Sequence, residues 1–183
     1  LHTPRFGAAS DAAEEDVRGG TGGYLLVLHD SSQGQYEQQR LGFVVDIPQG
    51  FYDLLWPGDY KIAQLELLMV LVALARNAEE MRGRRGVWWI DNVCALMALI
   101  KGRSDQPDLD RLALLIHAAM FSLQTWIYFE WVQSKSNWSD GISRKGSESE
   151  WHREHGFSTD YAAVPMVLWN MPFLSVIEVC SFL

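Results

Sequence analysis

A short apolar strand that stands between two helical segments constrains the fold of this chain most strongly. The run GVWWID, residues 86–91, follows a helical segment at 61–81 and precedes another at 92–102. A strand that alternates with helices pairs in parallel with its neighbours through right-handed crossovers, and helices then cover the sheet. The pattern therefore predicts an α/β fold with a partly parallel sheet.

The remaining segments complete a sheet of five strands. The predicted strands lie within residues 4–13, where a short strand runs into Asp11, and at 24–30, 39–47, 86–91 and 124–133. The predicted helices cover residues 61–81, 92–102, 107–123 and 136–146. The first three strands follow one another through the polar turn at 14–23 and the loop SSQGQ, so they form an antiparallel meander. We expect a mixed five-stranded sheet, antiparallel over its first three strands and parallel at the fourth and fifth.

Composition limits the classes of function. The chain has 183 residues, of which 48% are hydrophobic, enough for one sizeable core. A net charge of −8 argues against a protein that grips nucleic acid by bulk electrostatics, although bound cations would offset acids in a nuclease. Cys94 and Cys180 are too few for a disulfide framework or a four-cysteine zinc site. They favour a reducing, intracellular location in the cytoplasm or the nucleus.

The C-terminal segment is predicted to lie outside the main domain. Residues 1–146 are expected to form the domain, and residues 147–183 a linker and an apolar tail. Pro165 and Pro172 interrupt the tail, whereas a membrane-spanning helix needs about 20 clean apolar residues. We therefore expect an irregular tail packed on the domain, or the start of a neighbouring domain, and no membrane partner.

Four acids stand out by their positions. Asp11 ends the first predicted strand, Glu66 lies among leucines in the long helix, Asp91 ends the fourth strand, and Asp140 starts the last helix. Each also has an ordinary structural explanation. Asp11 could be a turn or helix-capping residue, Glu66 a solvated helix position, Asp91 the cap of the next helix, and Asp140 an acid favoured by the helix dipole. Their joint order is what points to a site.

Neighbouring first and fourth strands would bring these acids to one edge of the sheet. Clustered carboxylates repel each other and raise each other's pKa, and divalent cations reverse that effect. Hard oxygen ligands suit Mg²⁺ or Mn²⁺. Two such ions about 4 Å apart clamp the attacking water and the leaving oxygen of a phosphodiester.

Four segments carry a resemblance to a known family. They are SDAA at Asp11, QLELLMVLVAL at Glu66, WWIDNVCALMALIKG at Asp91 and WVQSKSNWSDGISR at Asp140. The last segment has the family's Asn-x-x-Asp-x-x-Ser-Arg pattern. Over residues 5–146 the chain resembles the ribonuclease H domain of reverse-transcribing elements, especially the retrotransposon branch. This resemblance implies a ribonuclease H-like fold.

The resemblance also implies an activity and a set of site residues. The activity is metal-dependent endonuclease cleavage of the RNA strand of RNA–DNA hybrids, by phosphodiester hydrolysis with two Mg²⁺ ions, Mn²⁺ being possible. Asp11, Glu66, Asp91 and Asp140 match the four catalytic, metal-binding acids. Asn92, Asn137 and Arg144 are expected to contact the substrate; Arg144 follows Asp140 by one helical turn. Such a domain belongs to a retroelement polyprotein with an attached or associated reverse transcriptase.

Two rival functions stay open on the sequence. One is a DNA-cutting nuclease of the same fold, and the other is a non-catalytic, connection-type domain that scaffolds a polymerase.

Two further features are expected to be structural. The aromatic strand TWIYFEWV is expected to pack mainly in the core, and His152 and His155 to lie in an exposed polar turn.

Overall fold

The structure is a computed structural model that describes residues 5–15, 19–32, 35–57, 61–172, 174–175 and 177–178. The end of the predicted tail, which includes Cys180, lies outside the described residues. The strands are β1 Phe6–Glu15, β2 Gly19–Ser32, β3 Gln35–Ile47, β4 Arg85–Ile90, β5 Trp126–Trp131 and β6 Ser158–Tyr161. The helices are α1 Gln49–Tyr52, α2 Ile62–Arg76, α3 Ala78–Met81, α4 Val93–Lys101, α5 Pro107–Leu123, α6 Asp140–Lys145, α7 Glu150–Glu154 and α8 Met166–Trp169. Two short 3₁₀ turns, η1 Ser134–Ser136 and η2 Gly146–Glu148, flank α6.

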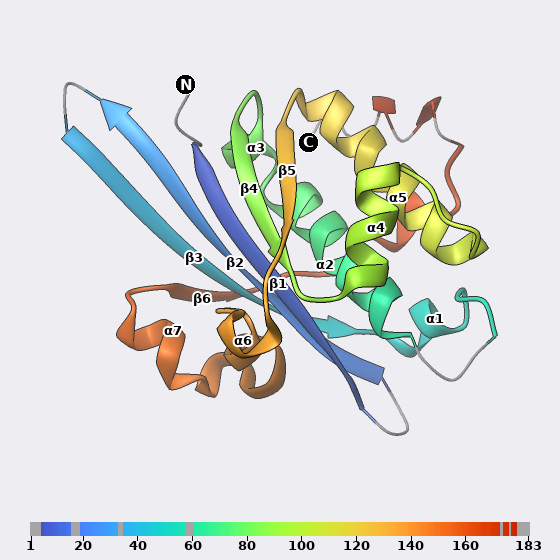
Figure 1. Ribbon diagram of the computed structural model, residues 1–183, viewed down its shortest axis with the longest axis horizontal. Coiled ribbons are helices and arrows are strands. Elements are labelled where there is room, and N and C mark those ends of the chain that lie inside the picture. The colour runs from blue at the N-terminus through green and yellow to red at the C-terminus, as the bar shows by residue number, and fades with distance from the viewer. Residues whose placement is uncertain are drawn as a thin grey trace.

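The strands form one mixed sheet in the order β5-β4-β1-β2-β3-β6 (Figure 1). The pairs β1–β2 and β2–β3 are antiparallel, and β4 and β5 extend the sheet in parallel from β1, as the sequence predicts. The described sheet has six strands rather than the predicted five. The sixth, β6, pairs in parallel with the outer edge of β3.

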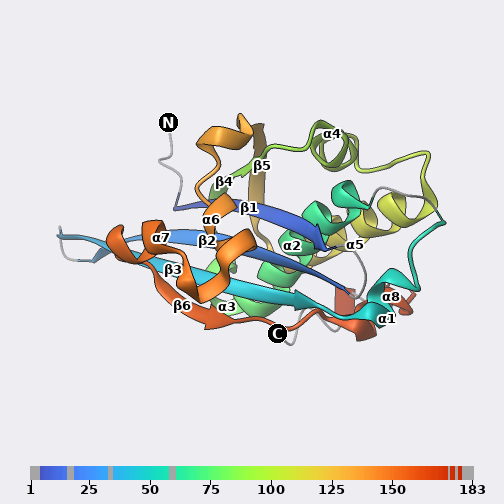
Figure 2. The same ribbon diagram turned by 90° about the horizontal axis from the view of Figure 1, so that it is seen from below.

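Helices lie on both sides of this sheet. The side chains of β2 alternate between two apolar clusters, because successive residues of a strand point to opposite faces. Tyr24, Leu26 and Leu28 join the large cluster formed with α2, α4 and α5. Leu25 and Val27 join a small cluster with Ile142 of α6. Accordingly α6 and α7 lie together, apart from α2, α4 and α5 (Figures 1 and 2).

Two local features differ from the sequence prediction because tertiary contacts override local preference. The predicted single helix at 61–81 is broken at Asn77, whose Oδ1 accepts a 2.8 Å hydrogen bond from the Tyr24 hydroxyl. The glycine-rich stretch predicted as a turn is largely strand, since β2 begins at Gly19. A Cβ on Gly22 would lie 2.3 Å from Met69 Sδ of α2, so glycine allows this close packing.

The aromatic residues of β5 also differ from expectation. Phe129 is buried beside Trp88, its partner in β4. In contrast, Trp126 and Tyr128 are 69% and 65% exposed, and Trp131 is 48% exposed. β5 is the edge strand of the sheet, and these three side chains stay largely exposed there, so core packing was the wrong expectation for most of this strand.

The segment predicted as linker and tail makes contacts with the rest of the chain. β6 joins the sheet, Leu168 of α8 is buried, and Trp169 packs edge-on against Phe51 with ring centroids 5.6 Å apart. The Arg111 guanidinium donates to the Trp169 carbonyl at 2.8 Å. Among the described helices, none has the length and apolar character that crossing a bilayer requires.

Candidate active site

Three of the four predicted acids meet at one point. Asp11 lies within β1, Asp91 follows the last residue of β4, and Glu66 lies on α2. One carboxylate oxygen from each of the three lies within 4.8 Å of the others. No other group of three possible metal ligands converges in this way within the described ranges.

Strand register places Asp11 beside Asp91. The parallel ladder pairs Phe6 with Gly86 and Ala9 with Trp89, an offset of 80 residues that carries Asp11 alongside Asp91. Asp11 was predicted to end its strand, and this was wrong: β1 continues to Glu15 in its pairing with β2. The two acids adjoin because β4 stops at Ile90 while β1 runs on.

Glu66 reaches the same point from a helix that is otherwise apolar. Leu65, Leu67 and Leu68 are all buried, and Glu66 itself is 1% exposed. A carboxyl group in such a place is costly unless it has a partner. Yet Glu66 Oε2 and Asp91 Oδ1 are buried without a hydrogen-bond partner in the described part of the chain. Buried, unpaired carboxylate oxygens in a cluster of three acids fit a divalent cation with oxygen ligands.

The electrostatics agree with this geometry. Burial, followed by the negative charges of Asp11 and Asp91, raises the pKa of Glu66 well above its ordinary value. Burial is also the largest cause that raises the pKa of Asp11, with smaller contributions from Asp91 and Asp140. Without a cation the cluster therefore holds its protons to higher pH than separate carboxyl groups would, and a bound cation would compete with those protons.

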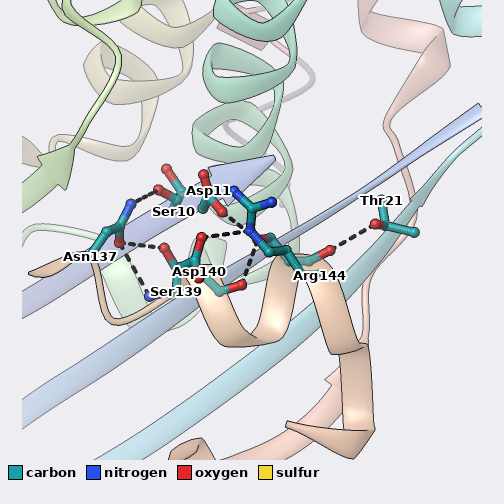
Figure 3. Close-up of polar contacts among 8 residues, drawn as sticks. Ser10, Asp11, Thr21, Asn137, Ser139, Asp140 and Arg144 are labelled. Carbon is teal, nitrogen blue, oxygen red and sulfur yellow. Dashed lines mark hydrogen bonds and ion pairs between the residues drawn. The ribbon is translucent and has the colours of Figure 1, made fainter. Parts of the chain in front are cut away.

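Asp140, the fourth predicted acid, lies beside this cluster and outside it. It begins α6, and its Oδ1 accepts a 2.7 Å hydrogen bond from Arg144 Nε (Figure 3). The bond to Asp140 is the largest cause that raises the pKa of Arg144, and the charges of Asp11 and Asp91 add to it. The Arg144 cation is thus the positive group nearest Asp140, and it acts on the neighbouring acids as well.

Ser143 is a residue of the site that sequence reasoning missed. It is 1% exposed, and its hydroxyl donates to Asp11 Oδ2, which lowers the pKa of Asp11 against the effect of burial. A signal was available, because residues three apart on a helix share a face, so Ser143 lies on the same side of α6 as Asp140. The serine of the Asp-x-x-Ser-Arg pattern thereby links α6 to β1.

Asn137 links the segment before α6 to β1 as well. Its Nδ2 donates to the Ser10 carbonyl at 2.9 Å, and its Oδ1 accepts from Ser139 N at 3.2 Å and from Ser139 Oγ at 2.6 Å (Figure 3). Ser10 is held in turn by Trp88, whose Nε1 donates to Ser10 Oγ at 3.0 Å. Asn137 is 6% exposed, so a substrate contact would require it to leave these partners.

Asn92 caps α4. Its Oδ1 accepts a 3.0 Å hydrogen bond from Ala95 N, which satisfies one of the free N–H groups at the start of the helix. The cap falls on Asn92 rather than on Asp91, so the carboxylate of Asp91 is left for the cluster.

The two histidines of the predicted polar turn have different surroundings. His152 was expected in an exposed turn, and this was wrong: it lies in α7, is fully buried, and its Nε2 is 2.7 Å from Thr159 Oγ1 of β6. His155 follows the helix and stacks on Trp151 with ring centroids 4.0 Å apart.

Comparisons with known proteins place the fold. No family model and no curated protein sequence matches the chain. Among solved structures, the chain is similar to an RNase H1 from the halophilic archaeon Halobacterium salinarum, with a TM-score of 0.52 and 18% identity over 78% of this chain and 96% of that one. It is also similar to the N-terminal RNase H domain of a Mycobacterium tuberculosis protein, with a TM-score of 0.51 and 13% identity over 84% of this chain and 99% of that one. The fold is therefore that of ribonuclease H domains.

Proposed function

We propose that this chain is a metal-dependent endonuclease that cuts the RNA strand of RNA–DNA hybrids. The observation that carries the proposal is the convergence of Asp11, Glu66 and Asp91, with two buried oxygens left unpaired. The two similar structures are RNase H proteins by name, and this likeness in fold supports the choice of substrate. The catalytic parts lie within residues 1–146, which we propose as the catalytic domain.

Asp11, Glu66 and Asp91 would hold two Mg²⁺ ions, or Mn²⁺ in their place, with Asp140 completing the ligand set from α6. Such ions polarise a phosphoryl oxygen and lower the pKa of a bound water. The chain's own contribution is to fix the carboxylates before the substrate arrives. The parallel register fixes Asp11 against Asp91, and Ser143 orients the Asp11 carboxylate.

The proposed substrate contacts differ in kind. Arg144 is 63% exposed at its side chain, so its guanidinium can exchange the Asp140 carboxylate for a phosphate of the substrate. For Asn137 we propose a positioning role, because its amide is engaged with Ser10 and Ser139. Asn92 holds the N-terminus of α4, and we propose that the rest of its partly buried side chain contacts the substrate.

A partner follows from the charge of the chain. A net charge of −8 gives weak general attraction to a polyanion. We therefore propose that an attached or associated reverse transcriptase supplies much of the grip on the hybrid, as in a retroelement polyprotein. Hybrids arise where reverse transcription takes place, in the cytoplasm or the nucleus of a cell, and that is the proposed location.

Asp91→Asn tests the proposal. It should reduce Mg²⁺-dependent cleavage of the RNA strand by about 10³-fold or more, because a lost ligand removes several kcal/mol of transition-state stabilisation. Asp105→Asn, at an exposed acid outside the cluster, is the matched control. Circular dichroism should show both variants folded. Equal cleavage by Asp91→Asn and the wild type would refute the site.

A substrate panel separates the rival functions. RNA–DNA hybrid, duplex DNA and single strands should be offered with Mg²⁺ and with chelator. Preferential cutting of duplex DNA would favour a DNA-cutting nuclease. No cutting, combined with no rise in melting temperature on adding Mg²⁺, would favour a non-catalytic scaffold, because a ligand that binds the native state must stabilise it.

A further inference from the structure

A hollow of about 650 Å³ lies beside Asp140, between α6, α7 and the segment before α6. Its size falls in the range of pockets that bind small ligands. It is lined by Ser134, Lys135, Ser136, Asn137, Trp138, Asp140, Gly141, Arg144 and Trp151. Asp140 and Arg144 belong both to this hollow and to the candidate active site, so the two are continuous.

The charges in the hollow favour an anion. Lys135 and Arg144 line it, against the single carboxylate of Asp140, which Arg144 already pairs. Lys135 is exposed, and none of the ion pairs found in the described ranges uses it. With two cations and one carboxylate, the hollow is locally positive on a chain whose net charge is −8. The side chains of arginine, lysine and serine commonly bind phosphate oxygens.

Trp151 gives the hollow a flat aromatic wall that is held in place. α7 approaches α6 closely because residue 141 is glycine: a Cβ there would lie 2.5 Å from Ser149 Oγ. His152, the next residue after Trp151, is fully buried and bonded to Thr159. The indole of Trp151 stacks on the His155 ring at an interplanar angle of 18° and is itself 40% exposed. The ring also packs against Phe157 with ring centroids 6.2 Å apart, so the exposed part of the indole that lines the hollow is the part left for a ligand to stack on.

We propose that this hollow binds an unpaired nucleotide of the RNA strand next to the bond that is cut. Lys135 and Arg144 would take its phosphate, and Trp151 would stack on its base. The base must be unpaired, because proteins stack aromatic side chains on bases that have left the helix. The inference rests on the proposed function for the identity of the strand. It predicts a preference for hybrids whose RNA strand extends beyond the DNA.

The test measures binding, with Ca²⁺ in place of Mg²⁺ so that cleavage does not interfere. The probes are fluorescein-labelled hybrids with blunt ends, hybrids with a single-stranded RNA extension at the 5′ or the 3′ end, and the free oligoribonucleotide. For the wild type, an extension at one of the two ends should increase affinity. Trp151→Ala should weaken binding of that hybrid and of the oligoribonucleotide roughly 5- to 100-fold, the loss expected for one stacked base.

Two variants separate stacking from folding. Trp151→Tyr should restore most of the affinity, because tyrosine also stacks. Trp126→Ala is the matched control, since this indole is 69% exposed on β5 and does not line the hollow, and its affinities should equal those of the wild type. Melting temperatures would show whether Trp151→Ala is unfolded. If it is, Trp151→Tyr decides the question: the inference predicts that the RNA extension still increases the affinity of this variant.

The outcomes distinguish this inference from the proposed function. Hybrid cleavage by the wild type, with affinities that Trp151→Ala leaves unchanged, overturns the nucleotide site and keeps the function. Affinity for the oligoribonucleotide that depends on Trp151, without any hybrid cleavage, keeps the nucleotide site and overturns the function.

Discussion

The two faces of the sheet are packed to very different extents. On one face α2, α4 and α5 enclose a large, continuous apolar cluster. On the other face the buried cluster under α6 contains only Leu25, Val27, Val44, Ile142 and Phe157 in the described part of the chain. Glu66 comes from the thickly packed face, and Asp140, Ser143 and Arg144 from the thin one. The candidate site thus joins a thickly packed half to a thinly packed half that hydrogen bonds of Asn137 and Ser143 also tie to β1.

The largest expected effect is on the free energy of unfolding, and one truncation on each face tests it. Leu112→Ala on α5 should lower the free energy of unfolding by about 2–5 kcal/mol, because Leu112 is fully buried and neighbouring helices cannot collapse into the space. Ile142→Ala on α6 should cost only about 2 kcal/mol, since a thin layer relaxes more easily. Urea unfolding measures both.

Cleavage should show the reverse order in that pair. Folded Leu112→Ala should cut the hybrid at close to the wild-type rate, whereas Ile142→Ala should cut more slowly because α6 carries Asp140 and Ser143. Equal losses of stability and of rate in the two variants would contradict the distinction between the faces.

The second effect concerns the hydrogen bond between the thin face and β1. Ser143→Ala should lower stability by about 1.5–3 kcal/mol, the value of a hydrogen bond to a charged group. Cleavage should fall about 10- to 100-fold, as when a residue that orients a metal ligand is lost. Ser147→Ala, at an exposed serine in the following turn, is the control.

A pH profile shows whether Ser143 positions Asp11. The Ser143 bond lowers the pKa of Asp11, so its removal should raise that pKa and move the acidic limb of the rate profile to higher pH. A profile of unchanged shape would leave Ser143 with a purely structural role.

The smallest expected effect concerns Glu66, which comes from the thickly packed face, and it is an effect on stability in the absence of metal. The pKa of Glu66 is raised above its ordinary 4.5 in the folded chain, so between 4.5 and the raised value the folded state binds more protons than the unfolded state. The contribution of Glu66 to stability in chelator should therefore be most favourable below this window and fall as pH rises through it. Glu66→Gln should reduce that fall and, at neutral pH, add roughly 0.5–2 kcal/mol. Glu148→Gln, at an exposed position, should change neither.

Thermal unfolding in chelator across pH measures this effect. A gain of 1 kcal/mol corresponds to about 2–4 °C in a chain of this size. A slope that is the same for Glu66→Gln and the wild type would show that Glu66 does not hold the proton.

The sequence predicts the parts of this architecture that local pattern determines. The alternation around GVWWID predicted parallel pairing of β4, and Pro107 marked the start of α5. Glu66 and Asp91 drew attention because each is an acid in an apolar run. Their meeting with Asp11 depends on strand order, which the alternation of elements made predictable.

What the sequence did not predict depends on contacts between distant segments. β6 has the sequence STDY, which shows no apolar alternation, and it is a strand because the edge of β3 offers free backbone groups. Asn77 ends α2 through its bond to Tyr24, 53 positions away in the chain. The spacing of Ser143 from Asp140 places both residues on one side of α6, but the contact of its hydroxyl with Asp11 of β1 depends on the fold. Each of these cases requires the fold before the residue can be interpreted.

The constant offset of the β1–β4 pairing fixes how many residues must separate Phe6 from Asp11. Deleting one residue between Phe6 and Asp11 would shift the downstream part of β1 against its ladder and turn the carboxylate to the opposite side of the sheet, since side chains alternate with a period of two. The spacing from Phe6 to Asp11 must therefore be conserved in length even where its composition drifts.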